Sequence, residues 1–174
     1  MLRQLDHAGV RATFYLVGEQ VERYPALAAE VAAAGHEIGI HGYRHTLLLR
    51  RAPAELRDDF DRAEAAIGES AGVASFSYRP PYGVFSLAGL RLARARWAPL
   101  LWSHWGRDWE ARATPSSIAT RATRGLGPGA VILLHDSDAY SAAASWRQTV
   151  AALPAVLDAA AATGEPFVTA SHST

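Results

Sequence analysis

The chain has 174 residues, with 17 basic side chains balanced by 17 acidic ones and a sequence pI near 7.1. This length suits one domain with a sizeable core, and 49% hydrophobic with 20% charged residues is typical of a folded protein. A net charge of zero provides no global field for nucleic acid or an anionic membrane. We therefore expect no nucleic-acid partner, and recognition by a local site.

Two residue types are absent, and each absence excludes a class of chemistry. All 17 basic residues are arginine, which rules out a P-loop lysine, a Schiff-base enzyme and a Ser-Lys dyad. The chain has no cysteine, which rules out disulfides, thiol nucleophiles and thiolate metal sites. A metal in this protein would have to be held by histidine and carboxylate ligands.

Short apolar runs alternate with stretches of helical periodicity along the chain. The predicted strands are residues 12–17, 36–40, 75–78, 100–102, 130–134 and 166–169. The predicted helices are 19–34, 53–68, 87–95, 115–124 and 146–162, with Gly35 and Gly68 as helix ends and a kink near Pro154. This alternation predicts a parallel sheet or β/α barrel in a single domain spanning 1–174, with functional residues at the carboxyl ends of strands.

One familiar pattern fails on its context. Residues 68–72 (GESAG) match a G-x-S-x-G nucleophile elbow, but a predicted helix enters this segment and a strand leaves it, which is the reverse of what the elbow needs. No charged start precedes a short apolar block, and no run approaches the ~18 apolar residues of a membrane span. The chain as given therefore shows no export signal and no span, and its localisation stays open.

Three predicted strand ends carry unusual polar residues. His41 and His45 follow strand 36–40 at a spacing that lets two imidazoles reach one cation, although two histidines four apart on a solvated loop is the plainer alternative. Residues 79–83 (RPPYG) follow strand 75–78 as a rigid turn beside an arginine. His135 follows strand 130–134, where a general acid or base is commonly placed.

In this order, the three segments resemble the polysaccharide deacetylases with a NodB homology domain, which are carbohydrate esterases of family 4. Residues 41–46 (HGYRHT) are similar to the family's H-x-x-x-H metal motif, and 79–83 to its R-P-P-Y-G motif. Residues 133–135 (LLH) resemble the L-x-H motif, and 107–109 (RDW) the end of D-x-x-D-W. The resemblance covers almost the whole chain and implies a distorted (β/α) barrel.

The resemblance implies a metal-dependent hydrolase that removes N- or O-acetyl groups from a polysaccharide. It assigns His41 and His45 to a divalent metal, for which zinc is the usual ion with imidazole ligands and cobalt or nickel are substitutes. It makes His135 the general acid that protonates the departing amine. The acetylated glycan could be a chitin oligomer, peptidoglycan or xylan, and no protein partner is implied.

The resemblance also assigns roles around these groups. The backbone N–H of Tyr82, held in place by Pro81, would stabilise the oxyanion. Leu133 would line the pocket for the acetyl methyl group, and the ring of Trp109 would line the sugar groove. In the family's pattern Arg79 orients the catalytic base, and we expect Asp108 to be the remaining carboxylate that could hold it.

The chain departs from the family pattern at its beginning. The T-F-D-D-G-P motif, which supplies the base and the third metal ligand, lies upstream of the first helix, whereas Met1–Val10 resembles the end of that helix. The first strand of the barrel is thus expected to be missing, and Trp105 replaces the first Asp of D-x-x-D-W.

Two interpretations follow from this departure. Either the natural protein starts further upstream, with an export signal also cut from view, and is a deacetylase, or this is a short form that acts as a carbohydrate-binding pseudoenzyme. A third hypothesis, another metal hydrolase on a β/α barrel, would need Asp136 or Asp138 as a ligand.

Overall fold

The structure is a computed structural model that describes residues 1–172. Its strands form two parallel sheets. The larger has the order β1-β2-β3-β4, made of β1 (Thr13–Leu16), β2 (Glu37–Ile40), β3 (Ser77–Tyr78) and β4 (Ala98–Pro99). The smaller pairs β5 (His104–Trp105) with β6 (Ile132–Leu133). The parallel pairing confirms the predicted α/β class.

Helices connect the strands, as parallel pairing requires. The α-helices are α1 (Leu2–His7), α2 (Gly18–Arg23), α3 (Pro25–Ala33), α4 (Pro53–Ala71), α5 (Leu87–Arg94), α6 (Pro115–Ala122) and α7 (Ser145–Ala161). Short 3-10 turns are η1 (Leu48–Arg50), η2 (Pro81–Gly83) and η3 (Ala170–His172). No helix within residues 1–172 combines the length and apolar character needed to cross a bilayer.

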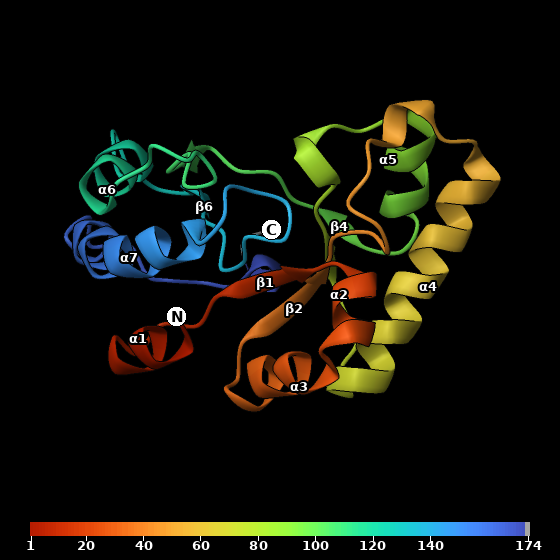
Figure 1. Cartoon of the computed structure of the whole chain (residues 1–174), viewed down its shortest axis with the longest axis horizontal. Coiled ribbons are helices and arrows are strands. Elements are labelled where there is room, and N and C mark those ends of the chain that lie inside the picture. The colour runs from red at the N-terminus through yellow and green to blue at the C-terminus, as the bar shows by residue number, and fades with distance from the viewer. Residues whose placement is uncertain (173–174) are drawn as a thin grey trace. The chain divides into compact units, whose positions relative to one another are not determined.

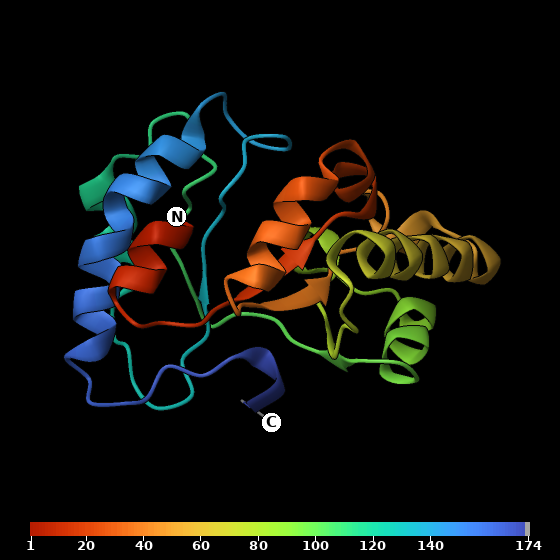
Figure 2. The same cartoon turned by 90° about the horizontal axis from the view of Figure 1, so that it is seen from below.

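The described residues group into two compact units, which we name after their longest helices. The α4 unit holds Arg11–Leu101 and residues 168–172, and the α7 unit holds Met1–Val10 with Trp102–Phe167. Within the α4 unit, α3 lies beside β2, and α4 runs along α2, α3 and α5 (Figures 1 and 2). Within the α7 unit, α6 and α7 pack side by side (Figure 1). The expectation of a single domain stays a prediction.

The core of the α4 unit is an aromatic cluster between α4 and the sheet. The Phe60 ring lies 4.8 Å from that of Tyr78 and 5.4 Å from that of Trp97, and the last two are stacked at 5.8 Å, measured between ring centroids. The buried stripe of α4 consists of four apolar residues that are all at most 1% exposed, namely Leu56, Phe60, Ala63 and Ile67. Their spacing of three and four places them on one helix face.

Four predicted elements differ from the structure. The helix expected over 19–34 is two helices, because Pro25 has no N–H to continue α2 and instead begins α3. Helix α4 passes through Gly68 and ends at Gly72, whose φ of 67° is the left-handed value that glycine tolerates. The strand expected at 100–102 is absent, with β4 before it and β5 after it, and 166–169 forms no strand.

Gly39 in β2 permits a close approach that shapes the interior of the α4 unit. The ring of Tyr15, opposite it on β1, lies across the glycine, so that a methyl group at position 39 would come within 2.6 Å of Tyr15 Cε1. It would also lie 2.8 Å from the hydroxyl oxygen of Ser77. The missing side chain of Gly39 thus leaves room for Tyr15.

Two glycine-to-alanine substitutions should therefore act in opposite directions. We expect Gly39→Ala to lower the free energy of unfolding by about 1–3 kcal/mol through overpacking against Tyr15. Gly68→Ala, at a helical position with no neighbouring atom within 4 Å, should raise it by about 0.5–1 kcal/mol. Urea unfolding of both variants tests this, and equal effects of the two would contradict it.

Candidate active site

His41 and His45 lie on the loop that follows β2, as the sequence predicted. Their ring centroids are 5.1 Å apart, with an angle of 61° between the ring planes. The Nδ1 of His41 lies 2.6 Å from the carbonyl oxygen of Arg79. Because a carbonyl only accepts, Nδ1 carries the proton in this bond and Nε2 of His41 becomes the nitrogen with a lone pair.

This pair fits a divalent cation as two of its ligands. Histidines that bind metals commonly donate their other ring N–H to a carbonyl or carboxylate, as His41 does. Within residues 1–172, however, no group of three or more His, Cys, Asp or Glu side chains is arranged to hold an ion. The described residues therefore supply a partial ligand set.

Arg79 enters the interior of the α4 unit directly after β3. Its side chain is buried, and its Nε and one terminal nitrogen donate to the carbonyl oxygens of Leu100 and Leu101 at 3.1 and 3.3 Å. The guanidinium carbon lies 4.1 Å from the ring centre of Tyr15, in cation-π contact. Burial lowers the pKa of Arg79, and Tyr15 partly counters that shift.

The turn after Arg79 has the rigidity that its prolines predict. Pro81 is buried, while Tyr82 is 58% exposed and has a left-handed φ of 59°, an uncommon value for a residue with a side chain. The Tyr82 ring lies 4.6 Å from that of His45. Backbone bonds from Gly83 to Pro80 and from Val84 to Pro81 close the turn, and neither uses the amide of Tyr82.

His135 lies two residues beyond β6 and is held by the buried carboxylate of Asp108. Asp108 accepts the His135 backbone N–H at 2.6 Å and its Nδ1–H at 2.9 Å, and the hydroxyl of Thr149 on α7 donates to it at 2.9 Å. Burial alone would raise the pKa of Asp108, but the bonds from His135 and Thr149 outweigh burial and lower it. The carboxylate therefore stays ionised and fixes the His135 ring.

Two of the expected substrate residues lie near His135. The Trp109 ring meets that of His135 edge-on, at 5.4 Å between centroids and 84° between planes. Leu133, in β6, is 9% exposed. On its other side Trp109 contacts Trp105, which is 44% exposed.

The structure brings the predicted residues together as two sets, one in each unit. His41, His45, Arg79, Pro81 and Tyr82 belong to the α4 unit, and Asp108, Trp109, Leu133 and His135 to the α7 unit. Sequence reasoning missed Thr149 and Asp59. Asp59 interrupts the otherwise apolar buried face of α4, and Thr149 lies among the buried residues of α7, which also include Ser145. A buried polar residue on a helix face is the signal that could have revealed them.

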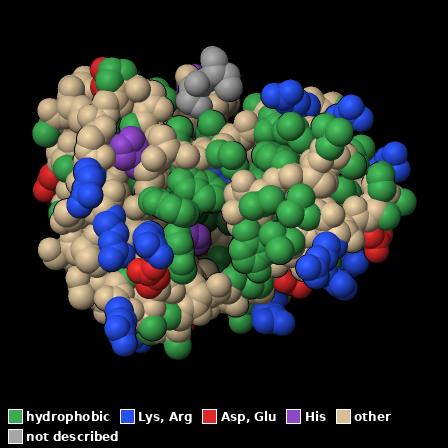
Figure 3. Space-filling view, turned by 90° about the horizontal axis from the view of Figure 1, so that it is seen from above, with side chains coloured by type: hydrophobic (Ala, Val, Ile, Leu, Met, Phe, Trp, Pro, Cys, Tyr) green, Lys and Arg blue, Asp and Glu red, His purple; other side chains and the backbone are tan. Residues whose placement is uncertain are grey.

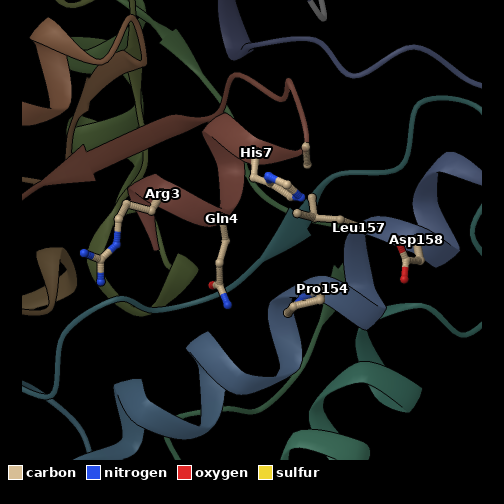
Figure 4. A pocket seen from close by; sticks show the side chains of 7 residues that line it. Arg3, Gln4, His7, Pro154, Leu157 and Asp158 are labelled. Carbon is tan, nitrogen blue, oxygen red and sulfur yellow. The ribbon is translucent and has the colours of Figure 1, made fainter.

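On the face shown in Figure 3, arginine side chains are spread among acidic, apolar and polar ones, as the balanced composition predicts. A cavity of about 510 Å³ in the α7 unit, toward which Gln4 and His7 of α1 extend, involves none of the predicted site residues (Figure 4). It is lined by Arg3, Gln4, His7, Ala8, Pro154, Leu157 and Asp158.

The sequence of the chain matches the model of a known protein family. The model of the family described as polysaccharide deacetylase matches residues 1–95, more than half of the chain. The chain belongs to this family. A chitooligosaccharide deacetylase from Bradyrhizobium is 36% identical to this polysaccharide deacetylase homologue over 138 residues, which are 78% of this chain and 63% of the relative.

Solved structures share the NodB-type fold. A peptidoglycan N-acetylglucosamine deacetylase is 29% identical with a TM-score of 0.88, over 97% of this chain and 77% of that one. A family 4 acetyl xylan esterase from Clostridium thermocellum, solved with a cobalt ion, is 25% identical with a TM-score of 0.86, over 99% and 80%. A mutant of a CE4-family pseudoenzyme with restored activity is 25% identical with a TM-score of 0.87, over 98% and 59%.

The sequence matches cover only part of each relative's length. The chain spans 43% to 63% of the length of three curated relatives that it matches. Membership of the family and the NodB-type fold are established by these comparisons.

Replacing Thr149 by valine should weaken the Asp108 site. The substitution removes one of the bonds that lower the Asp108 pKa, and we expect it to reduce the free energy of unfolding at pH 7 by about 1–3 kcal/mol. Because the folded-state pKa lies below the unfolded value of about 3.9, this stabilisation is present above that pH and is lost as pH falls through the folded pKa. The difference in unfolding free energy between the parent chain and Thr149→Val should therefore become smaller as the pH is lowered.

Urea unfolding between pH 3 and pH 7 measures this dependence. Thr120→Val, the same change at an exposed position of α6, is the matched control and should leave stability within about 0.5 kcal/mol. A Thr149→Val deficit that is equal at every pH would show that Thr149 acts by packing alone.

Proposed function

We propose that this chain is a metal-dependent hydrolase that removes acetyl groups from a polysaccharide. The observation that carries the proposal is the buried Asp108 carboxylate, which binds both the backbone and the ring of His135 at the end of β6. Such a pair fixes the imidazole tautomer and supports its protonated form, as a general acid requires. The two histidines after β2 supply the complementary half of the chemistry.

In this proposal His41 and His45 hold the metal, zinc being the ion we expect, with cobalt or nickel able to replace it. When bound, such an ion lowers the pKa of a water and polarises the acetyl carbonyl. The carbonyl of Arg79 keeps the proton of His41 on Nδ1 and so presents Nε2 as the ligand atom. The buried Arg79 side chain stiffens the segment that carries this carbonyl.

His135 performs the proton transfer. Asp108 keeps the His135 proton on Nδ1, so the second ring nitrogen, Nε2, is the atom that accepts and returns a proton. A departing amine needs a proton as its bond to the acetyl carbon breaks, and the protonated ring delivers it from Nε2. The role proposed here for Asp108 is to orient His135, which differs from the sequence expectation that it could hold Arg79.

The remaining residues position the acetylated sugar. The amide of Tyr82, which neither bond closing its turn uses, is proposed to donate to the oxyanion. Leu133 is proposed to contact the acetyl methyl group and Trp109 the sugar ring. The substrate is an acetylated glycan of the kinds named for the relatives: chitooligosaccharide, peptidoglycan or acetylated xylan.

A carbohydrate-binding protein without turnover is the second candidate, and one observation favours it. Residues 1–172 contain no cluster of three or more possible metal ligands. In this case the chain binds the glycan through Trp109 but releases no acetate. Glycan binding without acetate release, at saturating zinc, would establish this second function and reject the first.

Removal of either proposed metal histidine should weaken metal binding before it affects the fold. We expect His41→Ala and His45→Ala each to weaken zinc affinity at least about 10-fold, measured by isothermal titration. His104→Ala, a histidine in β5 that pairs with Ser103, is the control and should bind zinc as the parent does. Unchanged affinity in both site variants would remove these residues from the metal site.

Loss of the proposed acid should separate turnover from metal binding. His135→Ala should lower the rate of acetate release from acetylated glucosamine oligomers about 10²–10⁴-fold while zinc affinity is retained. Asp136→Ala, at the exposed neighbouring position, should change neither quantity. Loss of zinc on Asp136→Ala would instead support the alternative metal hydrolase that uses this carboxylate as a ligand.

A further inference from the structure

The start of α2 binds the carbonyl groups of the loop between His41 and His45. The backbone N–H of Gly18 donates to the carbonyl of Gly42, and that of Glu19 donates to the carbonyl of Tyr43, both at 3.0 Å. These two bonds fix the carbonyl groups of the loop. They leave its N–H groups to another partner.

That partner is Asp59, in the second turn of α4. One carboxylate oxygen, Oδ2, accepts the N–H of Tyr43 at 2.8 Å, and the other, Oδ1, accepts the N–H of Arg44 at 3.4 Å. The same Oδ1 accepts from the guanidinium of Arg51 at 2.6 Å. The Asp59 side chain is only 2% exposed, so its charge is buried but compensated by three donors.

The main chain at Gly42 is shaped to fit this carboxylate. Gly42 has a left-handed φ of 81°, and a methyl group at this position would lie 3.0 Å from Asp59 Oδ2. Glycine therefore serves both the backbone conformation and the close approach of the carboxylate. The loop between the two histidines is thus built around Asp59.

We propose that Asp59 is a positioning residue for the two-histidine loop. It acts through the amides of Tyr43 and Arg44, which lie between the histidines, and it keeps both rings at the separation at which they share one ion. This inference rests on the proposed function for the role of His41 and His45 as ligands. Ligands on an irregular loop need such support. A loop that is already ordered loses less conformational entropy when the metal binds, and its metal affinity is higher for that reason.

The test uses the whole chain with three substitutions. Asp59→Asn keeps one acceptor, whereas Asp59→Leu removes both. Asp61→Asn is the matched control, since Asp61 lies on the same helix but is exposed and pairs with Arg96 at the surface. Circular dichroism at the working temperature confirms that each variant is folded.

Two readouts follow the loop and the ion separately. Amide hydrogen exchange of Tyr43 and Arg44, measured without metal, should become at least about 10-fold faster in Asp59→Leu, while exchange in α6 and α7 stays unchanged. Zinc affinity should fall by about 10–100-fold in Asp59→Leu, by less in Asp59→Asn and not in Asp61→Asn. Saturating zinc should restore acetate release, which a general loss of stability would not allow.

The outcomes distinguish this inference from the proposed function. A folded Asp59→Leu or Asp59→Asn chain with parental exchange at Tyr43 and Arg44 and parental zinc affinity overturns the role of Asp59. If the parent chain binds no zinc but the exchange at these two amides still rises, Asp59 does position the loop, and the assignment of the loop to a metal is wrong. Should Asp59→Leu not fold, Asp59→Asn decides between these results.

Discussion

A buried carboxylate is costly unless several donors surround it, and this constraint governs the predicted site residues of each unit. Asp59 is surrounded by two loop amides and Arg51, and Asp108 by the backbone and ring of His135 and the hydroxyl of Thr149. In each case the carboxylate satisfies N–H groups of the segment that follows a parallel strand. These bonds tie the loops that carry His45 and His135 to the buried carboxylates.

The placement of these loops follows from the parallel sheets. Side chains at the carboxyl ends of β2, β3 and β6 are freed from strand pairing, and they are where His41, Arg79 and His135 lie. Membership of the polysaccharide deacetylase family, together with TM-scores of 0.86 to 0.88, shows that the fold is shared with a peptidoglycan N-acetylglucosamine deacetylase and an acetyl xylan esterase. Residues 1–172 contain no group of three or more His, Cys, Asp or Glu side chains arranged to hold an ion.

Sequence patterns predicted the local elements where periodicity or chemistry is strong. The stripe on α4 and the three polar strand ends are recognisable, because burial requires apolar residues at regular spacing and the polar residues stand directly after apolar runs. The pattern could not show that Tyr24 and Pro25 divide a helix, or that β4 and β5 replace a single strand, since competition between neighbouring elements decides such boundaries. The partners of Asp59 and Asp108 come from segments distant in sequence, and a linear pattern carries no record of them.

Thr149 links the orientation of His135 to the conformation of α7. Its hydroxyl reaches Asp108 from the interior of α7, so the third bond to the carboxylate exists only while that turn of α7 is wound. Pro154 lies in the next turn and cannot donate the hydrogen bond that a regular helix has there. The Thr149 bond, which helps to fix the carboxylate that holds His135, therefore depends on a turn of α7 that lies next to a position without its helical hydrogen bond.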